Sequence, residues 1–257
     1  MRRTNARYVH RFLGFIIGIQ LLCWTTSGLV FSWNPIEQVR GEHMVSSPSL
    51  LDMTKQDFVS VQDVLASHGT GLRDSEQCVQ LELRTMLEHP VYELAIEDTV
   101  THALRYVLID ANSGDQVSPI SESTARKIAI ADFSEEVSVL DAELLDATLG
   151  AHSEYRGKEL PAWRVELDHS NGTVIYISAN RGIVTARRND RWRLFDFFWM
   201  LHTMDYQGRD NFNTWVLRCI SIFGVSTVVS GYWLWWRTSR MRRRRLRKLK
   251  TKSAANR

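Results

Sequence analysis

The chain has 257 residues, 44% of them hydrophobic and 24% charged, values typical of a soluble protein, but its charge is segregated. Residues 1–11 carry four Arg and residues 237–257 carry eleven Lys or Arg, and neither stretch has an acidic residue. Between these tails 17 basic side chains stand against 29 acidic ones, a formal charge of −12. With three cysteines, two of them in apolar runs, the composition excludes a fold built on disulfides within one chain.

The first element predicted in chain order is a membrane-spanning helix at residues 12–33, a run of 22 residues without a charge. About 20 apolar residues in a helix cross a hydrocarbon core of ~30 Å. A secretory signal peptide, with Arg2 and Arg3 as its basic start, is the alternative. It is disfavoured because the run exceeds the usual ~7–15 apolar residues and no small-x-small cleavage site precedes Asn34.

Three helices are predicted in the acidic region that follows, from apolar residues at helical spacing. The first covers residues 54–68 with Thr54 and Asp57 in its N-terminal turn, and the second covers residues 121–131. The third covers residues 139–149, with Gly150 as its C-terminal cap. Carboxylates along this third segment are interpreted as a solvated helix face. The histidines of the region lack metal-ligand spacing and are interpreted as surface residues: 43, 68, 89, 102, 152 and 169.

The same region contains an internal repeat of alternating apolar residues. The stretches RYVLIDANSGDQV (105–117) and TVIYISANRGIVT (173–185) each run into Ala-Asn-x-Gly, at an offset of 68 residues. Each copy predicts a strand, a turn whose Asn and Gly tolerate positive φ, and a short second strand. Further strands are predicted just upstream, at 90–96 and 161–168. Together with the helices, this order predicts an α+β region of two small modules in tandem, 34–118 and 119–189.

The C-terminal part of the chain predicts an aromatic helix and a second membrane span. Residues 190–210 begin with DRWRLFDFFWMLHTM, which is too short and too charged to span a membrane and suits a helix in the outer interface. Packing of that helix under the acidic region is the alternative. The second span is placed at 211–236, with Arg218 reaching the interface and tryptophans at both ends. Small residues in both spans, including Gly14, Gly18 and Gly224, predict close helix packing.

The basic tails predict the topology. Lys and Arg on short flanks stay in the cytoplasm, so both termini of a bacterial inner-membrane protein would lie inside and the acidic region in the periplasm. The tail at 237–257 also has the composition of a nucleic-acid patch. Directly after an apolar helix, it is interpreted instead as a topology signal that touches anionic lipid, with no nucleic acid as partner.

The span sequences resemble those of PepSY-associated transmembrane proteins. The resemblance rests on YVHRFLGFIIGIQLLCWTTSGLVF (8–31), with its His-Arg, spaced Gly and Ser-Gly, and on FWMLHTMDYQGRDNFN (198–213) and VVSGYWLWWR (228–237). The two copies of the repeat resemble PepSY modules, so that the likeness covers residues from about 8 to 238. It implies two membrane helices joined to an external α+β domain.

The same resemblance implies two functions. Some relatives are linked to iron and siderophore reduction through b-type haem held by His in or near the spans, and work with flavin-containing reductase modules. No G-x-G-x-x-G motif follows a strand here, so a cytoplasmic flavoprotein reductase would be a separate partner. Soluble PepSY modules restrain extracellular peptidases, which implies the alternative of a non-catalytic, membrane-anchored module that binds a periplasmic peptidase or assembly factor.

Two histidines are the candidate haem ligands, because a neutral imidazole in a dry, apolar setting can hold haem iron. His10 lies at the basic edge of the first span and His202 in the aromatic segment. The alternative makes His10 an interfacial residue and pairs His202 with Asp205. If the aromatic segment lies outside, most of the ~30 Å hydrocarbon core separates the two histidines. Each would then pair with a histidine of another copy or subunit, or residues 193–210 would dip into the bilayer.

Overall fold

The computed structural model describes residues 3–47, 52, 56–69, 72–147 and 153–255. The chain forms two compact units. The helical unit comprises Met1–Trp33 and Asp196–Arg257, and the α+β unit comprises Asn34–Phe195.

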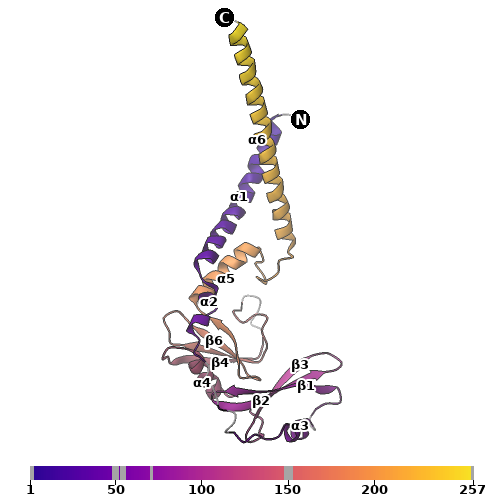
Figure 1. Cartoon of the computed structure of the whole chain (residues 1–257), viewed down its shortest axis with the longest axis vertical. Helices are drawn as coiled ribbons and strands as arrows, with labels where there is room; N and C mark the ends of the chain where they lie inside the picture. The colour runs from indigo at the N-terminus through magenta and orange to yellow at the C-terminus, as the bar shows by residue number, and fades with distance from the viewer. Residues whose placement is uncertain (1–2, 48–51, 53–55, 70–71, 148–152, 256–257) are drawn as a thin grey trace. The chain divides into compact units, whose positions relative to one another are not determined.

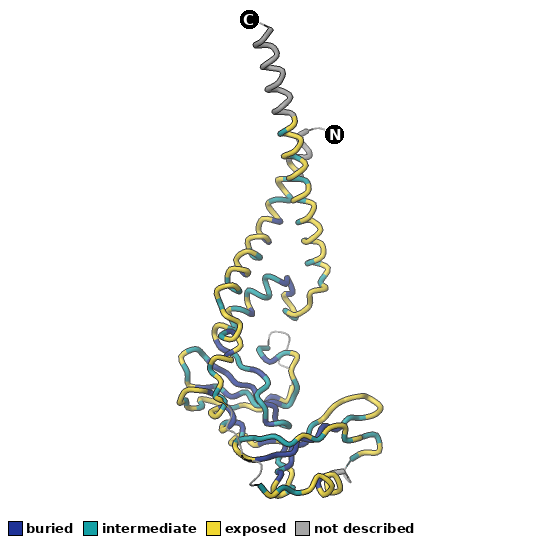
Figure 2. Tube along the Cα trace, in the orientation of Figure 1, coloured by how far each residue is buried: buried dark blue, intermediate teal, exposed yellow. Residues whose placement is uncertain are grey.

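Two long apolar helices dominate the helical unit (Figure 1). Helix α1 covers Arg3–Trp33 and helix α6 covers Trp215–Ala255, and their segments His10–Trp33 and Trp215–Arg240 are long and apolar enough to cross a membrane. Figure 2 shows that both helices are largely exposed, and apolar side chains such as Phe15 and Trp215 are 71% and 75% exposed. Because so much apolar surface is unfavourable in water, we conclude that the chain is a membrane protein.

The second apolar helix begins at Trp215, within the segment 211–236 in which the second span was placed. Residues 211–214 form a turn rather than helix, and the Thr214 hydroxyl accepts a hydrogen bond from the Leu217 N–H at 3.3 Å, as an N-cap does. Beyond the span, α6 continues through the basic tail as helix to Ala255.

The α+β unit contains two antiparallel sheets, each preceded by a helix. Helix α2 (Ile36–Val39), the 3-10 helix η1 (Glu42–Met44) and helix α3 (Val61–Gly69) lead into the first sheet, whose order is β1-β2-β3. Helix α4 (Glu122–Asp132) leads into the second, whose order is β4-β5-β6-β7. The strands are β1 (Glu76–Met86), β2 (His89–Asp98), β3 (Leu104–Asp110), β4 (Val139–Leu145), β5 (Ala162–Leu167), β6 (Val174–Ser178) and β7 (Val184–Arg188).

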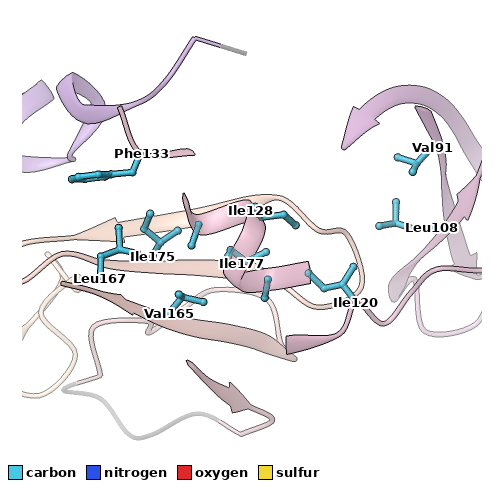
Figure 3. Close-up of a cluster of buried hydrophobic side chains, with 11 residues drawn as sticks. Val91, Leu108, Ile120, Ile128, Phe133, Val165, Leu167, Ile175 and Ile177 are labelled. Atoms are coloured by element: carbon cyan, nitrogen blue, oxygen red, sulfur yellow. The ribbon is translucent and has the colours of Figure 1, made fainter. Parts of the chain in front are cut away.

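One hydrophobic core joins the two sheets (Figure 3). Helix α4 packs on all four strands of the second sheet, and its Ile128 belongs to the cluster of buried side chains drawn there. Val91 and Leu108 of the first sheet belong to the same cluster, through Ile120. A second cluster, centred on Val64, fills the space between α3 and the first sheet. The α+β unit is therefore one folded body with two helix-and-sheet halves.

The internal repeat reappears in the backbone hydrogen bonds. The Gly114 N–H donates to the Asp110 carbonyl at 2.8 Å, and Gly182 donates to Ser178 at the same distance. Both glycines have positive φ, +81° and +60°. The asparagines of the two turns keep negative φ, so the left-handed conformation predicted for Asn and Gly is taken by Gly alone.

One predicted helix is a strand. Residues 139–145 form β4, and Gly150, its expected cap, lies outside the described residues. A bulge between Val139 and Asp141 puts Val139, Ala142 and Leu145 on the less exposed positions, and this spacing of three imitates a helix. The predicted solvated carboxylates are exposed, but on a strand.

Three smaller corrections concern the remaining elements. Helix α3 begins at Val61 rather than 54, because the Ser60 hydroxyl accepts a hydrogen bond from the Asp63 N–H at 3.1 Å and caps the helix there; Thr54 lies outside the described residues. Strand β1 was not predicted from the sequence. His169, expected at the surface, is partly buried and packs on Phe133 with ring centroids 5.1 Å apart.

Candidate functional site: two serine-held histidines

Helix α5 (Asp190–Thr203) covers the first two thirds of the segment predicted as an aromatic helix, and its last turn brings His202 against α1. The ring Nδ1 of His202 lies 2.8 Å from the Ser27 hydroxyl. Three aromatic rings surround the imidazole within the helical unit: Phe31 at 5.7 Å, Trp24 at 6.4 Å and Trp199 at 6.5 Å between centroids. Its setting is therefore apolar apart from one hydroxyl.

Polar side chains of α1 donate hydrogen bonds to the carbonyl groups at the C-terminal end of α5. The Gln20 amide donates to the Leu201 carbonyl at 3.2 Å, and the Trp24 indole donates to the His202 carbonyl at 2.9 Å. The last carbonyls of a helix have no partner within it, and lipid offers none. This explains a buried glutamine in the middle of a candidate span.

These contacts set the depth of His202 along α1. Gln20 and Ser27 lie in the interior of the candidate span His10–Trp33, so the end of α5 lies beside the span and not flat at its outer edge. This arrangement agrees with the prediction in which residues 193–210 dip into the bilayer, and not with the one in which they lie in the outer interface.

The loop after α5 satisfies its own polar groups. The Asp205 carboxylate accepts hydrogen bonds from the backbone N–H groups of Gly208 and Asn211, at 3.1 and 2.9 Å. Arg209 forms an ion pair with the buried Asp196. Non-helical backbone beside a membrane span is tolerated where such partners are supplied. Asp205 therefore stabilises the loop. In the structure it does not pair with His202, as the alternative would require.

His10 is held in the same way by the other helix. Its Nδ1 lies 2.8 Å from the Ser230 hydroxyl of α6, and a Cβ added to Gly231 would lie 3.5 Å from the ring. Close packing of α1 and α6, predicted from their small residues, is thus found at Gly231. At Gly14, Gly18 and Gly224 an added Cβ would meet nothing within 4 Å.

The hydroxyl geometry of the two serines favours one tautomer of both imidazoles. The Ser27 hydroxyl donates to the Trp24 carbonyl at 2.9 Å, and the Ser230 hydroxyl donates to the Thr227 carbonyl at 2.8 Å. With its proton directed to that carbonyl, each oxygen is placed to accept from an Nδ1–H, which is the neutral tautomer with the lone pair on Nε2. Within the described part of the chain, Nδ1 of each ring takes part in a hydrogen bond and Nε2 does not. An imidazole anchored through Nδ1–H with a free Nε2 is the usual form of a metal-ligating histidine.

The structure does not bring the two predicted ligands together. His10 and Ser27, the partner of His202, are 17 residues apart on α1, about 25 Å at 1.5 Å per residue. The serines were missed by sequence reasoning, because a serine in a membrane helix has no feature that marks it as a histidine partner. In the described residues, no three His, Cys, Asp or Glu side chains gather as metal ligands.

The α+β unit offers a second candidate site, a cavity of about 740 Å³. It lies between the tip of the β1–β2 hairpin, α4 and β7, and Met86, Ile128 and Val184 contribute apolar walls. The arginines at its edge are already paired, Arg84 with Glu93 and Arg187 with Asp132. The cavity therefore suits an uncharged or apolar side chain better than an anion.

Comparison with known proteins assigns the chain to a family. The family model described as PepSY-associated TM region matches residues 1–238. No curated protein and no solved structure matches the chain. The matched stretch includes the first candidate span, all but the last two residues of the second, both histidines and the whole α+β unit, and it confirms the resemblance drawn from the span sequences. The chain therefore belongs to the PepSY-associated TM region family.

Proposed function

We propose that this protein is a haem b-linked electron-transfer subunit of the bacterial inner membrane. The observation that carries the proposal is that two histidines, at two depths of the helical unit, each lie with Nδ1 2.8 Å from a serine hydroxyl, which leaves Nε2 available for a ligand. His10 and His202 would hold the haem iron. Bound haem supplies a one-electron Fe(III)/Fe(II) couple.

The surroundings of the histidines fit this cofactor. The serine hydroxyls would keep each ring in its ligating tautomer and orientation. Around His202, the rings of Trp24, Phe31 and Trp199 would exclude water, which together with hydrogen bonding is how a protein tunes a haem potential. The proposed mechanism asks for no general acid, base or nucleophile, since no bond is made or broken.

The partners follow from charge and from the motifs present. The basic tails favour a cytoplasmic location for both termini and a periplasmic location for the α+β unit. With no nucleotide motif in the chain, a cytoplasmic flavoprotein would be the reductant. Its reduced flavin would give up one electron at the inner side, and one electron would leave to an oxidant in the periplasm.

The test is a reduced-minus-oxidised spectrum of the full chain purified from membranes. We expect a b-type α-band, weakened in His10→Ala and in His202→Ala and unchanged in His102→Ala. The control residue His102 is an exposed histidine of the α+β unit and contacts Glu97. A colourless protein would refute the proposal, and equal bands in all four proteins would refute the ligand assignment.

A second candidate function is a membrane-anchored module that binds a periplasmic peptidase or assembly factor. The 740 Å³ cavity favours it, because a groove with apolar walls between strands and helix can accept a side chain of an extended segment. Ala131→Arg, at an exposed position of the lining, would block that cavity with a charged side chain. Loss of a co-purified periplasmic protein in this variant, with the haem spectrum retained, would support binding; retention of the partner would exclude the cavity.

A further inference from the structure

The helical unit leaves each haem site incomplete. Met1–Trp33 and Asp196–Arg257 contain two histidines, His10 and His202, and the other six of the chain lie in the α+β unit. Because about 25 Å of α1 separates His10 from the partner of His202, the helical unit offers one imidazole at each depth. A b-type haem held by two histidines at either depth therefore needs a second ligand from outside this helical unit.

We propose that the second ligand at both depths comes from a second copy of this chain, in a parallel dimer that rests on the proposed haem function. The basic tails insert every copy with the same orientation, so His10 of one copy lies at the depth of His10 of the other. A two-fold axis along the membrane normal then brings each histidine to its own counterpart. One symmetry operation completes both sites, whereas a different subunit would have to place histidines at two separate depths.

The surface beside His10 is suited to this contact. Gly14 and Gly18 follow His10 at intervals of four residues, which places them along one side of α1, and the space around them is open. On α6 an apolar hollow of about 400 Å³ is lined by Val228, Gly231, Tyr232 and Trp235, and a Cβ added at Gly231 would lie 3.5 Å from the His10 ring. In lipid, helices associate through close approach at small residues, which these positions allow.

The dimer would carry two haem sites stacked across the membrane, about 25 Å apart along α1. An electron entering at the His10 pair would pass to the His202 pair before leaving to the external acceptor. The balance is one electron in and one out at each site, with no change in bonds or protons. The two serine-anchored histidines of a single chain are then the two halves of a transmembrane relay.

The test is native mass spectrometry and electron paramagnetic resonance on the full chain in lipid nanodiscs. We expect a dimer with one haem per chain and the low-spin signal of two imidazoles. Co-expression of a wild-type chain and a His10→Ala chain under different tags, purified through both, should convert about half of the haem to a high-spin, carbon monoxide-binding form. The same pairing with His102→Ala should remain fully low-spin.

The outcomes separate the dimer from the function on which it rests. Absence of haem would overturn both. Low-spin haem in a monomer, or low-spin haem in a complex of one copy with a different polypeptide, would overturn the dimer and leave the haem function standing. A mixed dimer with His10→Ala that stays fully low-spin would also overturn it.

Discussion

The buried carboxylate of Glu93 offers the sharpest stability prediction for the α+β unit. Glu93 in β2 is 6% exposed and accepts hydrogen bonds from Arg84 at 2.9 Å and from Arg181 at 2.9 Å. Arg84 belongs to the first sheet and Arg181 to the Ala-Asn-x-Gly turn of the second, and the Arg84 guanidinium also donates to the Arg181 carbonyl. We predict that Glu93→Gln, which keeps the volume and removes the charge, weakens the junction of the two sheets.

The expected cost is about 3 kcal/mol. Removing one partner of a buried ion pair costs about 3–5 kcal/mol, because the remaining charge is buried and unpaired. The lower end applies here, since the side chains of Arg84 and Arg181 are 17% and 26% exposed and water can solvate them in part. Since 1.36 kcal/mol corresponds to a factor of ten, this loss raises the equilibrium constant for unfolding by about a factor of 100.

Amide hydrogen exchange of the full chain in detergent measures this change, read on peptides from β2 and β6. Glu143→Gln is the matched control, an exposed carboxylate on a strand whose removal should change stability by less than about 0.5 kcal/mol. Adding Arg84→Met to Glu93→Gln should recover about 1 kcal/mol, because it removes the guanidinium that has lost its carboxylate, whereas Arg181 keeps Glu159 at 3.9 Å. Equal protection in Glu93→Gln and Glu143→Gln would refute the account of the junction.

Three further predictions address pH, backbone conformation and the histidine anchor. Hydrogen bonds from an arginine side chain and from a backbone N–H lower the pKa of Glu76 from 4.5 to about 2, so the stability it contributes is fully present above pH 4.5 and is lost as the pH falls towards 2. Acid titration of unfolding should be shallower in Glu76→Gln, and identical titrations would contradict this. Gly182→Ala should destabilise the fold more than Gly114→Ala, because both have positive φ but only at Gly182 would the new Cβ fall 2.5 Å from a methionine sulfur; equal melting temperatures would contradict the close approach. Ser27→Ala should shift the haem midpoint potential and Ser27→Thr should restore it, whereas an unchanged potential in Ser27→Ala would show that the serine does not anchor His202.

Patterns local in the sequence predicted most of the architecture. The segregated charge and the two apolar runs indicated the two membrane helices, because these two signals depend on local composition alone. The Ala-Asn-x-Gly repeat indicated two equivalent strand-and-turn units, since only glycine takes positive φ without strain. The helix predicted at 139–149 was wrong because a bulge replaced the strand period of two by a spacing of three.

Local sequence patterns could not predict the contacts that define the candidate site. Ser27 and His202 are 175 residues apart, and His10 and Ser230 are 220 apart. Which serine meets which histidine depends on how α5 returns along α1 and where α6 crosses it. The hydrogen-bond partners of the two imidazoles are therefore a property of the packed helices and cannot be read from the sequence alone.

The haem content of the full-length chain, purified as wild type and as the double variant His10→Ala/His202→Ala, tests the central claim most directly. The account predicts a b-type difference spectrum with one haem per chain in the wild type, and no haem in the double variant while the α+β unit keeps its hydrogen-exchange protection. A wild-type protein without haem, or a double variant that retains the wild-type spectrum, would contradict it.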